Sequence, residues 1–152
     1  MLAAVSTMMG LFLVAFAAAT IFPMQSEAAL AGLVLAGHHP PVLLVAVASA
    51  GNTLGAVVNW VLGLGVERFR SRRWFPVGDA ALDRASRWYR RYGRWSLLLS
   101  WMPLFGDALT VAAGVLREPL LPFLLLVFVA KTGRYVVLVL AVLGVVGGQP
   151  RP

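Results

Sequence analysis

Cysteine is absent from this sequence of 152 residues, and charged residues are scarce. The absence of cysteine excludes disulfides, cysteine-ligated zinc sites and thiol chemistry. Charged residues make up 12% of the chain and hydrophobic residues 60%, whereas a soluble domain has about 25% and 45–50%. Such a chain has too few polar residues to cover a small soluble globule. The composition predicts an integral membrane protein with a single domain.

The usual motifs of cofactor and metal binding are also missing. The chain has no glycine-rich phosphate-binding loop of the P-loop type. His38 and His39 are adjacent in a Pro-containing turn without nearby carboxylates, whereas zinc requires three or four convergent ligands. We therefore expect no cofactor and no metal site.

Acidic residues are few, and the basic residues are concentrated in one block. Glu27 is the only charged side chain between residues 1 and 66, whereas residues 67–94 contain nine Arg against three acidic residues. A uniformly basic protein would suggest a nucleic-acid partner. A basic block between apolar segments is instead typical of a cytoplasmic loop. We expect residues 67–94 to lie in the cytoplasm, and we expect no nucleic-acid partner.

The apolar residues form several segments of different length. Four of them are long enough for a membrane span of about 20 residues, at residues 2–22, 42–66, 95–116 and 120–146. The segment 95–116 is interrupted by Pro103 and Gly106. A further segment at 28–36 is too short to cross as a helix. Gly51 and Gly55 lie four residues apart and predict a close-packing face for another helix.

The basic block contains a predicted amphipathic helix at residues 79–92, with Asp79 as its N-cap. Its apolar face combines Leu82 and Ala85 with the aromatic residues Trp88, Tyr89 and Tyr92, and Arg residues occupy the other face. This pattern favours an interfacial helix lying on the membrane. The alternative is a helix that packs its apolar face on the protein itself.

A short motif occurs twice in the sequence. Glu27 follows Pro23 by four residues, and Asp107 follows Pro103 by four residues, each within apolar sequence. Each copy is followed by a short apolar stretch, a turn that contains Pro, and a long span. The motif therefore predicts two related halves, at residues 1–66 and 95–146, joined by the basic block.

Helices broken inside a membrane survive only where protein or a water-filled cavity covers the backbone. Paired broken segments in two halves are typical of a transporter site near the membrane midplane. The sequence thus predicts an all-α integral membrane protein. Its expected architecture is an inverted repeat with two broken re-entrant hairpins, transmembrane helices and one interfacial amphipathic helix. The alternative is that Glu27 and Asp107 are simple caps near the headgroups.

Several motifs together resemble those of the DedA superfamily, which carries the VTT (SNARE-associated Golgi protein-like) domain, and most closely its YqaA-like branch. They are Phe22-Pro23-Met24-Gln25-Ser26-Glu27, Gly51-Asn52-Thr53-Leu54-Gly55 with Asn59-Trp60 and Gly63, Arg73-Trp74-Phe75-Pro76, and Trp101-Met102-Pro103 with Gly106-Asp107 and Ala113-Gly114. The resemblance covers about residues 20–140. It implies two re-entrant hairpins that enter from opposite sides, and a role in moving lipid headgroups across the bacterial inner membrane, with dependence on the proton motive force.

The chain departs from the better-known branch of this superfamily at four positions. Gln25 replaces a Pro and Ala56 replaces an Asp. Ser100 and Gly106 stand where that branch has two Arg, which would be natural partners of a phosphate. Candidate cationic replacements are Arg117, Lys131 and Arg134.

The leading hypothesis is a non-enzymatic translocase for a lipid headgroup, such as a phosphate-bearing one, or for a small solute, with protons as the coupling ion. The candidate binding residues are Glu27, Asp107, Asn52, Asn59, Arg117, Lys131 and Arg134, with breaks at Pro23, Pro103 and Gly106. Asn52 and Asn59 are expected to line the cavity. We expect Lys131 and Arg134 to lie near Asp107, since such side chains are costly in lipid. The rival hypotheses are a membrane assembly factor whose charges only pair helices, and an intramembrane hydrolase.

Overall fold

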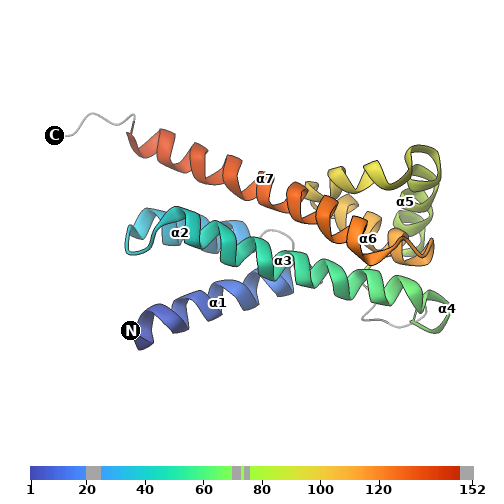
Figure 1. The fold of residues 1–152 in the computed structure, drawn as a ribbon, viewed down its shortest axis with the longest axis horizontal. Helices are drawn as coiled ribbons and strands as arrows, with labels where there is room; N and C mark the ends of the chain where they lie inside the picture. Colours follow the sequence, from blue (N-terminus) through green and yellow to red (C-terminus); the bar gives the residue numbers. More distant parts are fainter. Residues whose placement is uncertain (20–24, 70–72, 74–75, 148–152) are drawn as a thin grey trace.

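The structure is a computed structural model that describes residues 1–19, 25–69, 73 and 76–147, and these residues contain helices but no strand. In chain order the helices are α1 (Leu2–Ala18), α2 (Gln25–Ala36), α3 (Pro41–Leu64), α4 (Val66–Phe69), α5 (Asp79–Tyr92), the 3-10 helix η1 (Gly93–Trp101), α6 (Phe105–Val115) and α7 (Leu120–Gly147). The long helices α3 and α7 run along the molecule. Helices α1 and α2 lie at one end of them, and α5 and α6 lie at the other (Figure 1).

Helices α3 and α7 are the two described helices that are long and apolar enough to cross a membrane. They contain 24 and 28 residues, and at about 1.5 Å per residue both exceed a hydrocarbon layer of about 30 Å. Helix α3 has Pro at its first position and ends at Leu64, with Gly65 as its C-cap. The predicted spans at residues 42–66 and 120–146 therefore agree with the structure to within two residues at each end.

The other apolar helices are shorter than a full span. Helix α1 has 17 residues and α2 has 12, so the span predicted at 2–22 ends at Ala18 in the described part, and Pro23 lies outside the described residues. The segment predicted at 95–116 is divided into η1 and α6, of nine and 11 residues. Pro103 lies in the break, and Leu104 after it has a positive φ of 64°, a conformation that L-residues rarely adopt.

Helix α3 packs backbone to backbone against two neighbours through its glycines. A Cβ added at Gly51 or Gly55 would collide with the Phe12 or Phe16 carbonyl oxygen of α1. A Cβ added at Gly63 would lie 2.9 Å from the Cα of Gly114 in α6. The face predicted from Gly51 and Gly55 is thus occupied by α1. Close approach of this kind lets helices associate where the solvent is itself apolar.

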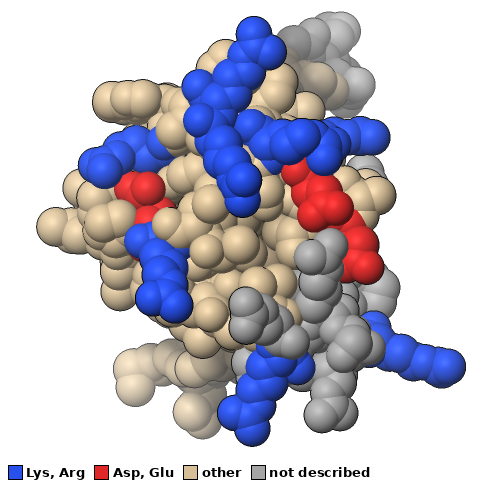
Figure 2. Space-filling view, turned by 90° about the vertical axis from the view of Figure 1, so that its right-hand side faces the viewer, with Lys and Arg blue, Asp and Glu red and all other residues tan. Residues whose placement is uncertain are grey.

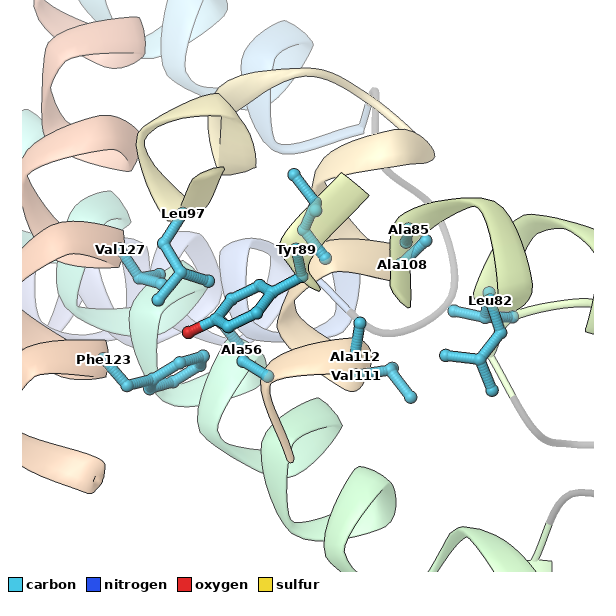
Figure 3. Close-up of a cluster of buried hydrophobic side chains, with 13 residues drawn as sticks. Ala56, Leu82, Ala85, Tyr89, Leu97, Ala108, Val111, Ala112, Phe123 and Val127 are labelled. Atoms are coloured by element: carbon cyan, nitrogen blue, oxygen red, sulfur yellow. The ribbon is translucent and has the colours of Figure 1, made fainter. Parts of the chain in front are cut away.

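Helix α5 packs its apolar face on the protein. Leu82, Ala85 and Tyr89 are buried and belong to a cluster that includes Ala108 and Ala112 of α6 (Figure 3). These alanines allow α5 to approach closely. For Leu82, Ala85 and Tyr89 the structure therefore agrees with the alternative, in which the apolar face packs on the protein itself. Trp88 and Tyr92 remain partly exposed. The N-cap is Gly78, and Asp79, the expected cap, is the first helical residue.

The end of the molecule that carries α5 is strongly basic. Figure 2 views this end and shows many Lys and Arg side chains spread over it, with fewer acidic ones between them. Arg84, Arg87, Arg90 and Arg91 of α5 are exposed. The described Arg residues of α5 therefore lie on the surface rather than in an internal cluster.

Replacing Gly63 by Ala is expected to destabilise the protein, because the added methyl group would meet the Val111 carbonyl and the Gly114 Cα. Overpacking of this kind typically costs about 1–3 kcal/mol. The loss would appear as a lower thermal unfolding midpoint in detergent. Gly144→Ala is the control, because a Cβ there meets nothing within 4 Å, and it should leave the midpoint unchanged or raise it. Equal midpoints for the two variants would contradict the close contact between α3 and α6.

Candidate functional site

Two ion pairs join the short helices α2 and α6 to α7. Lys131 Nζ lies 3.4 Å from Asp107 Oδ1, and Arg134 Nε pairs with Glu27 Oε1. Glu27 is the third residue of α2, and Asp107 is the third residue of α6. Both carboxylates therefore lie in the first turn of a helix, where the helix dipole favours negative charge.

The two cations come from one stretch of α7. Lys131 and Arg134 are three residues apart, so they lie on neighbouring positions of one helix face. Each forms an ion pair with an acid from a different half of the sequence. Arg134 was expected near Asp107, and it lies close enough to interact with this acid electrostatically, but its ion-pair partner is Glu27 of the first half. Helix α7 thus connects the two acids that the repeated motif singled out.

The two pairs differ in exposure. Side-chain exposure is 5% for Lys131 and 15% for Asp107, compared with 17% for Arg134 and 23% for Glu27. Arg134 Nη1 also donates a hydrogen bond of 2.8 Å to the Trp101 carbonyl oxygen of η1. The pair of Glu27 and Arg134 is therefore the more open of the two, and it also contacts the second half.

Arg134 borders a groove between η1 and α7. The groove has a volume of about 510 Å³, and the other residues that line it are Trp101, Pro103, Val129, Ala130, Gly133 and Val137. Its walls are apolar except for the guanidinium. A groove with apolar walls and one cation suits a ligand that is largely apolar and carries an anionic group.

Asn52 and Asn59 of α3 support the end of α1. Asn52 Nδ2 donates to the Ala15 carbonyl oxygen at 3.1 Å, and Asn59 Nδ2 donates to the Ala19 carbonyl oxygen at 2.7 Å. The last carbonyls of a helix have no partner within the helix, and in a membrane they cannot rely on water. The two amide nitrogens therefore allow α1 to end inside the bundle, and the cavity lining expected from the sequence stays a prediction.

Further polar side chains link these residues to the ion pairs. Asn59 Nδ2 lies 3.3 Å from Thr110 Oγ1, and Thr110 donates to the carbonyl oxygen of Asp107 at 2.7 Å. On the other side, Tyr135 of α7 donates to Ser26 Oγ at 2.9 Å, next to Glu27. A polar belt of side chains thus joins α2, α3, α6 and α7 around the two acids.

Several oxygen atoms of the interior have no hydrogen-bond partner within the described part of the chain. They are Asn52 Oδ1, Thr53 Oγ1, Asn59 Oδ1, Ser100 Oγ, Ser49 Oγ and Thr132 Oγ1. Buried polar atoms without partners are uncommon in folded proteins. These atoms are therefore available for a further polar contact.

Other residues predicted for the site lie elsewhere. Arg117 is exposed in the turn after α6, at the opposite end of that helix from Asp107. Gly106 contributes no side chain, but its Cα lies so close to the backbone of Ser100 that a Cβ would collide with it. Pro103 lines the groove.

Sequence reasoning missed Glu118, which lies between Arg117 and Pro119 in the turn before α7. Its Oε2 accepts a hydrogen bond of 2.8 Å from Tyr89, and its Oε1 lies 3.2 Å from Arg94 Nε. Its carbonyl oxygen accepts a bond of 3.0 Å from Trp60 Nε1. Burial, together with the hydrogen bond to Glu118, raises the pKa of Tyr89, so this hydroxyl remains a donor at physiological pH. No spacing in the sequence signals this cluster, because its members are far apart in the chain.

Comparison with known proteins gives one family and several relatives. The VTT domain family matches residues 22–144. "Inner membrane protein YqaA" of Escherichia coli and that of Shigella flexneri are each 36% identical to the chain over 132 residues, which cover 86% of this chain and 87% of theirs. A protein of Haemophilus influenzae is 33% identical over 138 residues, which cover 84% of this chain and 82% of its own length. No solved structure matches.

These findings agree with the motifs and with the helices. The matched region includes both acids of the repeated motif, the glycines of α3 and both cations of α7. The two apolar helices α3 and α7 are compatible with the inner-membrane location that the names of the relatives give. The protein is an inner membrane protein that belongs to the VTT-domain (DedA) family.

Proposed function

We propose that this protein is a transporter that moves a lipid headgroup or a small solute across the inner membrane, coupled to the movement of protons. The observation that carries the proposal is the pair of Glu27 and Arg134, which is partly exposed and borders the groove of about 510 Å³ between η1 and α7. A ligand seated in this groove would contact the guanidinium of Arg134.

The proposed architecture is an inverted repeat with two re-entrant hairpins, in which α2 and α6 are the inner helices of the two halves. The equivalent places of Glu27 and Asp107, each third in its helix, support it. So does the length of α2 and α6, which are too short to cross a membrane. In an inverted repeat such matching points converge near the midplane.

The proposed mechanism uses the two acids as proton sites and Arg134 as the site of the cargo. While Glu27 is ionised, it occupies the guanidinium. Protonation of Glu27 weakens this pair, and the guanidinium then accepts an anionic group, such as a phosphate on a lipid headgroup. The buried oxygens without partners, such as Ser100 Oγ in η1 and Asn52 Oδ1 in α3, supply further polar contacts.

Reconstitution of the purified chain into liposomes tests this proposal. Labelled anionic lipids placed in one leaflet should reach the other leaflet faster with the protein than without it, and an imposed pH gradient should change the rate. Neutral labelled lipids are the control for general disturbance of the bilayer. Equal rates with and without the protein, for lipids and for small anions alike, would contradict a transport function.

A second candidate function is a membrane assembly factor whose charges pair helices. It is favoured by the pair of Asp107 and Lys131, which is almost completely enclosed. The two functions predict different behaviour for variants that neutralise the acids. A transporter loses its rate and keeps its fold, whereas an assembly factor loses its fold or its expression.

The orientation of the protein in the membrane can be tested separately. The excess of Arg in residues 67–94 predicts that this part faces the cytoplasm. The chain contains no cysteine, so Ser86→Cys in α5 introduces a single thiol. A membrane-impermeant thiol reagent should label it in inverted membrane vesicles and leave it unlabelled in intact cells. Labelling in intact cells would reverse the orientation. Ser71, which lies outside the described residues, is a second labelling position.

A further inference from the structure

Helix α5 exposes a surface that no other described part of the chain covers. Its buried side consists of Leu82, Ala85 and Tyr89. At 100° per residue, Arg84, Arg87 and Arg91 lie opposite this side, and all three are exposed. Trp88 and Tyr92 lie on the flank between the two sides, and they are 38% and 47% exposed.

The exposed aromatic and basic side chains of α5 lie close to one another. The rings of Trp88 and Tyr92 have centroids 4.4 Å apart, and the guanidinium of Arg91 lies 5.5 Å from the centre of the Tyr92 ring. Trp95, just after α5, is 67% exposed. Aromatic rings with neighbouring cations are typical of the membrane–water interface, where the ring is partly apolar and the cation remains hydrated.

The position of α5 in the molecule agrees with such an interface. The helix lies at the end of the bundle where α3 ends and α7 begins (Figure 1). Since α3 and α7 are the helices long enough to cross the membrane, this end lies at the level of the headgroups. The basic surface seen in Figure 2 therefore lies beside the bilayer of the same membrane.

Helix α5 also contacts both ends of α6. Trp88 packs edge-on against Phe105, the first residue of α6, with centroids 6.1 Å apart. Tyr89 donates to Glu118, which follows the end of α6. Asp107 is two residues beyond Phe105. A change in the position of α5 therefore shifts α6, the helix that carries Asp107.

We infer that Arg84, Arg87 and Arg91 with Trp88 and Tyr92 form a docking surface for anionic phospholipid headgroups, and that this contact holds α6 and its Asp107 in place. Anionic phospholipid is the occupant that fits, because basic side chains near an anionic membrane surface are attracted to its headgroups. Arg also matches the geometry of a phosphate. The regulatory part of this inference rests on the proposed function, whereas docking does not.

The test uses the full chain in lipid nanodiscs with and without phosphatidylglycerol. Ala81→Cys places a polarity-sensitive dye on the flank of Trp88, one heptad before it, at an exposed position in a chain without cysteine. We expect the dye emission to shift to shorter wavelength in discs that contain phosphatidylglycerol. Hydrogen exchange in α6 should become slower in the same discs. Neither measurement requires transport, so both remain valid if the proposed function fails.

Two matched variants make the test specific. Arg84→Gln/Arg91→Gln should abolish both responses to phosphatidylglycerol, whereas Arg68→Gln/Arg73→Gln removes the same charge from exposed positions outside α5 and should retain them. If both variants lost the two responses equally, the responses would depend only on net charge, and the inference would be overturned. A dye shift without slower exchange in α6 would overturn the link to Asp107. A shift caused by soluble polyglutamate in neutral discs, and absent with phosphatidylglycerol, would assign the surface to an acidic protein instead.

Discussion

Replacing Glu27 by glutamine is expected to reduce transport in liposomes by about tenfold or more, which corresponds to about 1.4 kcal/mol of activation free energy. Glutamine has nearly the same shape and can still accept a hydrogen bond from Arg134. It cannot be ionised, so it neither releases a proton nor returns the guanidinium to its resting partner. The pH gradient should therefore no longer change the remaining rate. The measurement is the rate of movement of labelled lipid with and without the gradient.

Stability provides the control for this variant. Because Glu27 is the more exposed acid and Arg134 keeps its hydrogen bond to the Trp101 carbonyl oxygen, neutralising Glu27 should lower the thermal unfolding midpoint less than Lys131→Met does. Asp83→Asn removes an exposed acid of α5 and should retain both the rate and its response to the gradient. Normal gradient-dependent transport by Glu27→Gln would exclude this carboxylate as the coupling site. A variant that fails to fold would support the assembly factor.

Replacing Lys131 by methionine is expected to destabilise the protein by about 3–5 kcal/mol, because the substitution leaves the carboxylate of Asp107 without its partner. Lys131 is 4% exposed, and the side chain of Asp107 is only 15% exposed, so water cannot replace the lost contact. Methionine fills nearly the same volume, and packing is therefore retained. The loss can be measured as a free energy of unfolding in mixed detergent micelles.

The double variant Lys131→Met/Asp107→Asn separates the lost pair from other effects. It removes both charges, and replacing a whole buried pair is often neutral or stabilising, so most of the stability should return. The coupling energy of the double-mutant cycle then measures the pair itself. Arg134→Met should cost less stability than Lys131→Met, because the pair that it removes is more open. If Lys131→Met alone were as stable as the parent, the enclosed pair would not be present.

The sequence was most informative about the elements that depend on local composition. The spans α3 and α7 were predictable because a membrane helix requires a long apolar run, and Pro at the start of α3 marks its boundary. The break near Pro103 was predictable because a helix cannot continue through Pro unchanged. The 3-10 form of η1 was not predicted, since its apolar residues fit an α-helix equally well.

Contacts between distant residues were much harder to predict. The motif identified Glu27 and Asp107, but it gave no reason to pair Arg134 with the former rather than the latter. The partners of Asn52 and Asn59 are backbone carbonyls of α1, and a carbonyl oxygen has no signature in a sequence. The sequence left open whether the apolar face of α5 packs on the protein or on lipid, because both environments favour the same apolar side chains.

The two ion pairs on α7 also leave the described interior of the bundle without a net charge. The charges of Lys131 and Arg134 cancel those of Asp107 and Glu27. A net charge in this low-dielectric region is unfavourable, so under the proposed function one added proton favours the entry of one monovalent anion. When either ion leaves, binding of the other ion becomes less favourable. By thermodynamic reciprocity, the anion raises the affinity for the proton by the same factor by which the proton raises the affinity for the anion.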